Sequence, residues 1–553
     1  MELQNKSDKK RDVKEEEYHL DVPEESFWEG IKRHVRSYCE IASIQGLNYM
    51  VKDGVSWFER AWWIIVFILC IGGCSYMVFK IIDKWNTTPV LVSLATKETS
   101  IHEVPFPAVT ICPETKISRS CLNYTETLRK RRSGKGSEIE LQENLYFDFM
   151  SLLCRPDNHV ASFDSFQKMN ETEKGFDPNI LMLNDYAEFL DECKSVTLDN
   201  AYCKWMGKVV ECKKILTPIL TDEGMCYSFN MFDVRDIYSD VNKMEYYDES
   251  RRNPDWDPDS GYPEGKLDDV YPRRAFMNGA KNALEVVILT KKSDVYYSCR
   301  DFALQGIRVT LNMPGRIPRP SQVFFSVGFD RLTTVAVTPS YMTTTSTVRD
   351  YDPQDRNCYF GKERKLKYFK LYSQSNCNME CFTNYTINYC GCSHFFMPRD
   401  ANTSICSLDK RFCLEEARVN YPKSILSEYL KSSQESQSDG ACDCLPMCTD
   451  LNYNSEISSG FWTINAEEEY EISKDYHASA VKVFFKSSYF LPTEKSELYG
   501  FTDFVSNAGG VLGLFTGFSL FSLAEIIYFL SIRLIENYRR YGYWAGERVS
   551  DTE

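Results

Sequence analysis

The chain has 553 residues, more than one hydrophobic core holds at roughly 100–200 residues per domain. Its content of 43% hydrophobic and 26% charged residues is typical of a folded protein and excludes a fibrous or disordered chain. The formal net charge of −15, without a long basic stretch, argues against nucleic acid as a partner.

The first apolar segment lies at residues 61–83, after a charged and polar N-terminus that predicts no signal peptide. Its length of about 20 residues matches a hydrocarbon core about 30 Å thick. Trp62 and Trp63 at one end and Trp85 at the other resemble the aromatic belts of membrane-spanning segments. We therefore predict a cytoplasmic segment at residues 1–60 and a transmembrane helix at 61–83.

The cysteines indicate where the middle of the chain lies. Of 21 cysteines, 18 fall between Cys112 and Cys448, an even number typical of paired bridges in an oxidising compartment. Close pairs such as Cys390-x-Cys392 also suggest a metal site, but the oxidising compartment favours disulfides, so we expect no metal. Asn-x-Ser/Thr sequons predict N-glycosylation at Asn86, Asn123, Asn170, Asn384 and Asn402. We expect residues 84–500 to be extracellular.

The second apolar segment lies at residues 501–535 and is too long for a simple span. A continuous helix from Phe504 to Leu534 would measure roughly 46 Å, so it has to tilt, project or break. Basic residues flank the inner ends of both segments, which predicts cytoplasmic termini, a tail at residues 536–553, and a multi-pass protein of the plasma membrane.

Small residues follow one face of this second segment. Gly509, Gly513 and Gly517 share a stripe with Ser506, which allows either close helix packing or bare backbone along a water-filled path. The sequence Gly517-Phe518-Ser519 is where we expect the helix to break. Glu525 would cost about 2.5–3.5 kcal/mol in a span, so we expect it to face water or a partner. One such helix per chain cannot enclose a path, so a pore needs a ring of subunits.

Several motifs together indicate a family. They are FPAVTIC (106–112), LTPILTDEGMCYSFN (216–230), YSQSNCNMECFTNYTINYCGC (372–392), CDCLPMC (442–448) and GGVLGLFTGFS (509–519). The chain resembles the epithelial sodium channel/degenerin family over residues of about 46–534, and within it the insect pickpocket branch most of all.

The resemblance implies an α+β membrane protein with two transmembrane helices. Its disulfide-rich ectodomain would have a β-rich palm and knuckle with a helical finger and thumb. The function implied is a subunit of a homo- or heterotrimer of related chains in the lipid bilayer, conducting sodium, blocked by amiloride and insensitive to voltage. A stimulus acting on the ectodomain would gate it. No cofactor is expected besides the permeant sodium ion.

The family's functional positions can be placed on this sequence. The resemblance puts the selectivity filter on Gly517, Phe518 and Ser519, and the bulky Phe518 leaves strict sodium-over-potassium preference open. The degenerin position, where bulky substitutions hold relatives open, falls on Ser506. Relatives carry a His-Gly gating motif before the first span, where this chain has Gln45 and Gly46. The pore-lining residues implied are Gly509, Gly510, Gly513 and Glu525.

Seven disulfides also follow from the resemblance. They join Cys112 to Cys226, Cys203 to Cys212, Cys358 to Cys448, Cys377 to Cys444, Cys381 to Cys442, Cys390 to Cys413 and Cys392 to Cys406. The sequence alone does not pair Cys121, Cys154, Cys193 and Cys299. The basic run ending at Arg132 fits a proprotein-convertase site, with a solvated loop as the alternative interpretation.

Other classes of function remain to be weighed. Six scattered histidines and the lack of a nucleophile or phosphate-loop motif argue against an enzyme. A non-conducting receptor or adhesion protein would share the topology, but it has no need for the glycine stripe or Glu525. An ATP-gated two-span channel would lack the FPAVTIC and Gly-x-Ser motifs. The gating stimulus, whether mechanical, osmotic, peptide, pheromone or proton, is left open.

Overall fold

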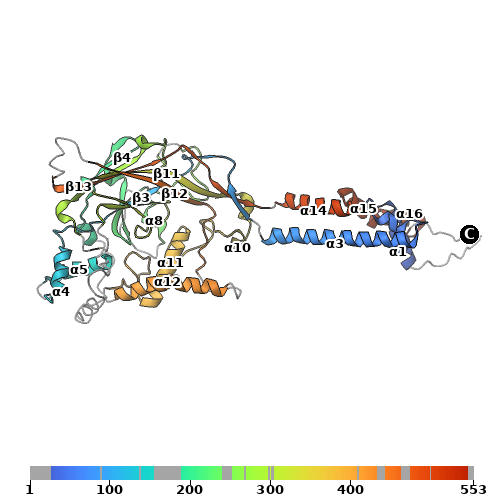
Figure 1. Cartoon of the computed structure of the whole chain (residues 1–553), viewed down its shortest axis with the longest axis horizontal. Coiled ribbons are helices and arrows are strands. Elements are labelled where there is room, and N and C mark those ends of the chain that lie inside the picture. The colour runs from blue at the N-terminus through green and yellow to red at the C-terminus, as the bar shows by residue number, and fades with distance from the viewer. Residues whose placement is uncertain are drawn as a thin grey trace, which may run out of the picture. The chain divides into compact units, whose positions relative to one another are not determined.

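The computed structural model describes residues 27–87, 90–135, 139–154, 189–239, 252–266, 269–296, 299, 304–407, 410–432, 442–462, 474–498 and 500–545 (Figure 1). The chain divides into two compact units. The smaller unit combines Met1–Pro89 with Leu498–Glu553, and the larger unit is Val90–Glu497.

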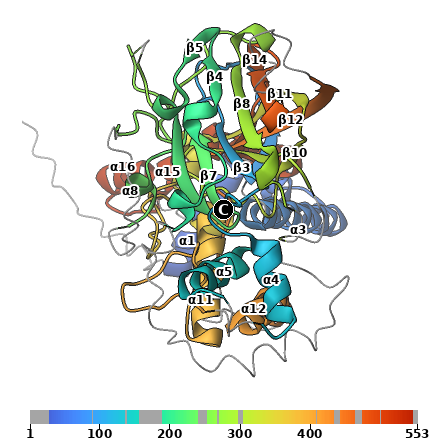
Figure 2. The same cartoon turned by 90° about the vertical axis from the view of Figure 1, so that its left-hand side faces the viewer.

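An eight-stranded sheet forms the frame of the larger unit. Its strands are β1 (Val90–Leu94), β4 (Tyr202–Trp205), β5 (Lys208–Val210), β8 (Leu284–Lys291), β11 (Arg331–Thr344), β12 (Asp450–Phe461), β13 (Tyr476–Phe485) and β15 (Thr493–Glu497). They run in the order β1-β15-β11-β13-β8-β4-β5, and β12 pairs with β11. β11 is antiparallel to β12, from Arg331 opposite Phe461 to Met342 opposite Asp450, and parallel to β13 and β15. Figure 2 labels β4, β8, β11 and β12 of this sheet, in which β13 lies between β8 and β11.

A five-stranded sheet is packed within the same unit. Its order is β10 (Phe325–Val327), β9 (Ile307–Asn312), β3 (Ala108–Pro113), β7 (Gly224–Phe229) and β6 (Leu216–Thr221). Every residue of β3 and β7 is buried, so neither strand shows the alternation of a sheet with one face in water. The buried hydroxyls of Thr110 on β3 and Ser228 on β7 satisfy each other at 2.9 Å. A small ladder pairs β14 (Tyr489–Phe490) with β2 (Thr99–Ser100).

Phe106, the first residue of the FPAVTIC motif, joins the two sheets. Its fully buried ring lies 4.9 Å from Trp205 and 5.3 Å from Phe485 of the large sheet, and 6.0 Å from Phe229 of the small one. Such edge-to-face aromatic contacts add to the free energy gained by burial. The motif is therefore a packing element at the centre of the core.

Two helix pairs belong to the larger unit (Figure 2). One consists of α4 (Tyr124–Arg132) and α5 (Leu141–Leu153), the other of α11 (Gln374–Cys390) and α12 (Arg411–Ser432). Shorter helices are α8 (Val234–Ile237), α9 (Ser346–Arg349) and α10 (Pro353–Arg356), and 3₁₀ turns occur at η3 (Leu198–Asn200), η4 (Cys212–Lys214), η5 (Ala280–Asn282) and η6 (Lys292–Asp294). The mixed α/β, disulfide-rich fold that we expected is thus present in the described residues.

Nine disulfides hold the larger unit together. Seven are the pairs implied by the resemblance, Cys112–Cys226, Cys203–Cys212, Cys358–Cys448, Cys377–Cys444, Cys381–Cys442, Cys390–Cys413 and Cys392–Cys406. The structure pairs the remaining four as Cys121–Cys193 and Cys154–Cys299. The sulfurs of Cys377, Cys381 and Cys444 lie close enough for a metal site, but all three are in disulfides and cannot act as thiolate ligands.

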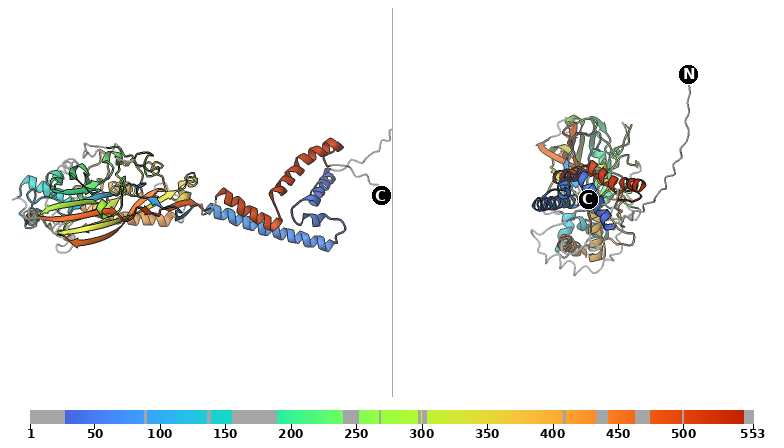
Figure 3. Two further views of the ribbon diagram at one scale, coloured as in Figure 1. Left: turned by 90° about the horizontal axis from the view of Figure 1, so that it is seen from above. Right: turned by 90° about the vertical axis from the view of Figure 1, so that its right-hand side faces the viewer.

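The smaller unit is helical. Its elements are α1 (Phe27–Ile41), α2 (Leu47–Val51), α3 (Trp57–Thr87), α14 (Phe501–Thr516), α15 (Leu520–Leu530) and α16 (Ile532–Tyr541). Among the described residues, α3 is long and apolar enough by itself to cross a bilayer. Residues Phe501–Thr516 and Leu520–Tyr541 meet the same criterion only as one broken span, bent by 76°. Figure 3 shows this bend in the red helices beside the blue α3.

Candidate functional site

The break between α14 and α15 is centred on Gly517. This residue has φ +70°, and its amide closes α14 by donating to the Gly513 carbonyl at 2.9 Å. A left-handed residue costs roughly 1–2 kcal/mol for any side chain beyond hydrogen, so glycine fits this position. Ser519 then begins α15, because its hydroxyl accepts from the Ser522 amide and its own amide donates to the Ser522 hydroxyl at 3.1 Å. The break predicted at Gly517–Ser519 is confirmed.

The chain before α3 lies against this break. The Gln45 amide donates to the Thr516 carbonyl at 3.0 Å, one of the carbonyls that the end of a helix leaves without an intrahelical partner. A Cβ atom on Gly517 would lie 2.8 Å from Cγ of Gln45. Gly46, with φ +96°, then begins α2. The segment with Gln45 and Gly46 therefore packs so closely against position 517 that a residue larger than glycine would collide with it.

The same segment also contacts α15. The Ser43 amide donates to Oε2 of Glu525 at 2.9 Å, and the hydroxyls of Ser43 and Ser522 lie 2.7 Å apart. Further along, Nε2 of His34 is 3.1 Å from the Phe529 carbonyl. Residues that precede α3 thus contact the broken helix both before its break, on α14, and after it, on α15.

The glycine stripe of α14 faces away from α3. The two helices meet through Trp85, whose ring stacks on Phe504 at 4.7 Å, and through Phe515, which a Cβ on Gly73 would approach to 2.9 Å. Apart from the adjacent residues and the backbone of α14 itself, no atom in the described part of the chain lies within 4 Å of where Cβ atoms of Gly509 or Gly510 would be.

Three further predicted residues of this region can be placed. A Cβ on Gly513 would meet only the Phe518 carbonyl, at 3.7 Å, among the described residues. Ser506 is exposed on α14, and Glu525 is half-buried. The stripe is open to a path or to another subunit.

The predicted modification sites lie in varied surroundings. Asn384 and Asn402 are exposed, whereas Asn123 caps α4 by accepting from the Glu126 amide. Asn86 lies in the last turn of α3, and Asn170 lies outside the described residues. Arg132 ends α4, so the basic run is helical and not the solvated loop of the alternative interpretation, whereas cleavage there stays a prediction.

The residue before it shows why this run is held in the helix. The Arg131 side chain is buried, pairs with Asp148 at 2.8 Å and lies over the Phe147 ring. A protease that needs an extended chain would have to unwind this turn.

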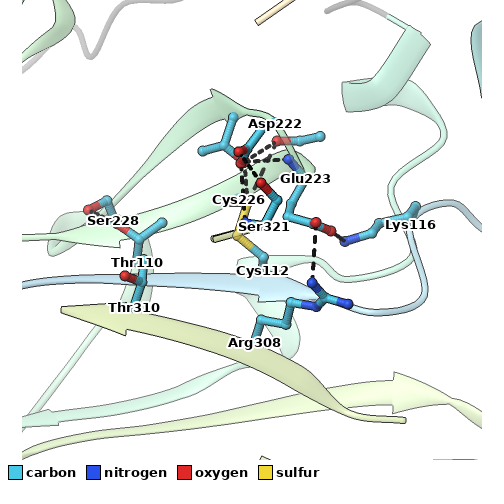
Figure 4. Close-up of a disulfide and its surroundings, with 12 residues drawn as sticks. Thr110, Cys112, Lys116, Asp222, Glu223, Cys226, Ser228, Arg308, Thr310 and Ser321 are labelled. Atoms are coloured by element: carbon cyan, nitrogen blue, oxygen red, sulfur yellow. Dashed lines mark hydrogen bonds and ion pairs between the residues drawn. A yellow bond between two sulfur atoms is a disulfide. The ribbon is translucent and has the colours of Figure 1, made fainter. Parts of the chain in front are cut away.

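A buried network of four charged side chains is a feature that our sequence analysis missed, and Figure 4 shows three of them, Lys116, Glu223 and Arg308. Lys116 Nζ lies 3.2 Å from Glu223, and Arg308 pairs with both Glu223 and Glu114. All four side chains are less than 10% exposed, and two positive charges balance two negative ones. An available signal was the pair Asp222-Glu223 inside the apolar stretch LTDEGMC, because carboxylates are rarely buried without cations.

Comparison with known proteins identifies the family. The sequence profile of the amiloride-sensitive sodium channel family matches residues 38–529. Pickpocket protein 28 of Drosophila melanogaster is 26% identical over 528 residues, which cover 91% of this chain and 79% of that protein. The sodium channel protein Nach of the same species is 22% identical, over 92% of this chain and 89% of its own. Acid-sensing ion channel 4-B of Danio rerio is 25% identical over 46% of this chain and 44% of its own.

The match of the family profile begins within α1 and ends within α15, so it takes in both long apolar segments and the whole disulfide-rich unit between them. Members of this family are ion channels and not enzymes, and they assemble with related subunits. The chain belongs to the amiloride-sensitive sodium channel family and is a cation channel subunit.

Proposed function

We propose that this chain is a subunit of a trimeric, amiloride-sensitive, voltage-insensitive sodium channel of the plasma membrane. In this proposal α3 and the broken helix α14–α16 are the two spans, both termini are cytoplasmic, and the larger unit is the extracellular region that receives the stimulus. Homomeric and heteromeric assembly with related subunits both agree with the family.

One observation carries the proposal: the second apolar helix breaks at Gly517-Phe518-Ser519. An interrupted helix at membrane depth is stable only where its backbone is buried or lines a cavity. The end of a helix leaves carbonyl groups without intrahelical partners, and such groups can replace part of the hydration shell of a cation. The open glycine stripe on α14 supports the same interpretation, because three such faces around an axis would leave a narrow path lined by backbone.

The contact between the pre-α3 segment and the break supports gating within each subunit. Gln45 hydrogen-bonds to Thr516, which precedes Gly517, and Ser43 to Glu525, which follows it. A movement of α14 relative to α15 therefore has to move this segment as well or break one of the two hydrogen bonds. We propose that Gly46 supplies the turn that lets the segment reach the filter. Both hydrogen bonds are donated by backbone amides, so neither depends on the identity of the side chain at position 45.

The test is voltage clamp on cells expressing Ser506→Val, with surface biotinylation in parallel. Ser506→Ala is the control, because alanine is close in size to the native serine. A bulkier side chain on the exposed face of α14 is expected to prevent close approach of the helices and to hold the path open. We expect a steady inward sodium current, blocked by amiloride, for valine and not for alanine.

Two other results have separate meanings. Surface protein without current calls for co-expression with a related subunit. Lack of current there as well would contradict the proposal and favour a non-conducting receptor.

A further inference from the structure

A cavity of about 630 Å³ lies on the outer face of the eight-stranded sheet in the larger unit. Side chains of β8 alternate there: Val286 and Ile288 are fully buried in the core, whereas Val287 and Leu289 point the other way and line the cavity. Ala480 of β13 is paired with Val287, and its short side chain leaves the space above the strands empty. The floor of the cavity is therefore apolar and made by rigid strands.

Three aromatic residues, on or next to three different strands, line this cavity. Tyr202 is on β4, Tyr476 begins β13, and Trp462 directly follows β12. The Tyr202 side chain is 45% exposed although it stands at the edge of an apolar surface. Aromatic faces carry negative electrostatic potential and attract organic cations, most strongly for Trp and Tyr.

Three charged residues line the cavity in the part of the chain that the structure describes. Lys482 and Glu285 are paired at 2.6 Å and are 24% and 22% exposed, so they neutralise each other. The third is Asp199, in the η3 turn. It lies 2.5 Å from Lys213, which does not line the cavity, and the two side chains are 67% and 61% exposed. Water weakens both this pair and the attraction of Asp199 for a ligand cation, so the preference for a cation comes mainly from the aromatic rings.

We propose that this cavity binds a small organic monocation, an amine with an aromatic or apolar body. Its ammonium group would lie among the aromatic rings and Asp199, and its apolar part would cover Val287 and Leu289. The volume is in the range of sites for drug-sized ligands, roughly 300–1,000 Å³. The proposal rests on the larger unit alone and not on ion conduction, so each can fail without the other.

The test uses the full-length chain in detergent-solubilised membranes. A thiol is introduced by Leu289→Cys at the cavity floor and, as a matched control, by Leu426→Cys on α12, where the leucine is 57% exposed. All 18 cysteines of the larger unit are in disulfides, and wild-type protein corrects for labelling of Cys39, Cys70 and Cys74. The labels are the trimethylammonium-ethyl and the sulfonato-ethyl methanethiosulfonates, which differ in charge.

We expect the ratio of cationic to anionic labelling rates to be about fivefold larger at position 289 than at position 426, as a cation–π and carboxylate site would give. 2-Phenylethylammonium should slow labelling of Leu289→Cys in a saturable way, and neutral 2-phenylethanol should do so much less. Adding Asp199→Asn or Tyr476→Leu should lower both the rate ratio and the protection.

Two results would overturn the proposal. Equal rate ratios at the two positions, or equal protection by the amine and the alcohol, would show an apolar surface without preference for cations. Lack of labelling at position 289, with normal labelling at 426, would show that another part of the chain or a second copy covers this face.

Discussion

The Ser43 amide nitrogen lies 2.9 Å from Oε2 of Glu525, although the two residues are 482 positions apart in the chain. Glu525 is the one acidic residue of α15, and its hydrogen-bond donor belongs to the loop between α1 and α2. The contact gives the half-buried acid of an apolar helix a partner from its own chain, as is expected for ionisable groups in such helices. It also couples the N-terminal segment to the helix that follows the break.

Ser522 offers the most direct test of this coupling. Its hydroxyl lies 2.7 Å from the Ser43 hydroxyl and accepts a hydrogen bond from the Ser519 amide at 3.1 Å, so Ser522→Ala removes both of these hydrogen bonds. It also removes the longer contact of 3.4 Å with the Ser519 hydroxyl. At about 1 kcal/mol for each hydrogen bond, we expect a change of five- to thirtyfold in the equilibrium between open and closed channels. Single-channel open probability in membrane patches measures it.

Ser531→Ala serves as the control for this variant. The Ser531 hydroxyl bonds only to the Ile527 carbonyl of the preceding turn, at 2.5 Å, among the described contacts. Open probability should stay within twofold of the wild type there. An equal effect of both substitutions would mean that Ser522 acts through helix stability and not through Ser43.

Gly517→Ala tests the fit between the break and Gln45. The left-handed φ of +70° costs alanine roughly 1–2 kcal/mol, and its Cβ would lie 2.8 Å from Cγ of Gln45. We expect normal surface labelling but at least a tenfold loss of amiloride-blocked current. Gln45→Ala in the same chain should restore part of it by removing the close contact.

Gly510→Ala is the matched control, because in the described structure nothing lies within 4 Å of its Cβ and the residue is helical. Its current should stay near that of the wild type in a single subunit. If Gly510→Ala fails as severely as Gly517→Ala, the stripe as a whole is packed against a neighbour and the specific fit to Gln45 is not the cause.

The sequence predicted the features that follow from local chemistry. The apolar length of residues 61–83, the break at Gly517-Phe518-Ser519 and the paired state of the cysteines all depend on the residues at those positions. α3 is longer than the predicted span, from Trp57 to Thr87, because helix propensity does not end where the apolar run ends.

Features that depend on tertiary packing could not be predicted. The partners of Cys121 and Cys154 are 72 and 145 residues away, and no spacing rule selects them. The contact from Ser43 to Glu525 and the ion pair from Lys116 to Glu223 join distant segments in the same way. Arg131 looked exposed because a basic run is usually solvated, whereas the fold supplies Asp148 and buries it.

Glu223→Gln tests the buried charge network. The substitution keeps the size of the side chain but leaves the buried ammonium of Lys116 facing a neutral amide. Removing one partner of a buried ion pair typically costs about 3–5 kcal/mol. We therefore expect a lower midpoint of thermal unfolding for the purified chain and reduced surface biotinylation.

Glu456→Gln is the control for position 223. Its pair with Lys486 is 2.6 Å long, but the two side chains are 68% and 50% exposed. Exposed pairs contribute about 0–1 kcal/mol, so the unfolding midpoint should barely move. Similar losses in both variants would show that the network contributes no more than a surface pair.

Two aspartates in one loop should respond to pH with opposite signs. Burial raises the pKa of Asp259 above its ordinary value. The hydrogen bond that the Gly361 amide donates to Asp259 at 2.8 Å acts in the opposite direction, and the negative charge of Asp257 adds to the increase. The pKa of Asp255 is lowered, chiefly by the hydrogen bond from the Lys266 ammonium at 2.7 Å. Both residues belong to the larger unit, so unfolding of that unit reports on them.

The sign follows from which state binds the proton more tightly. The folded chain keeps the Asp259 carboxyl protonated at pH values above the ordinary pKa of 3.8. The folded state therefore loses stability relative to the unfolded state as the pH rises from 3.8 through the raised pKa. Asp259→Asn should therefore gain stability relative to the wild type between pH 3.5 and pH 7. For Asp255 the stabilising contribution is present above 3.8 and is lost as pH falls through its lowered pKa, so Asp255→Asn should be less stable than the wild type at pH 7 and approach it in acid. Thermal unfolding of the purified chain and both variants across this range measures the differences, and shifts of the same sign would contradict the assigned surroundings.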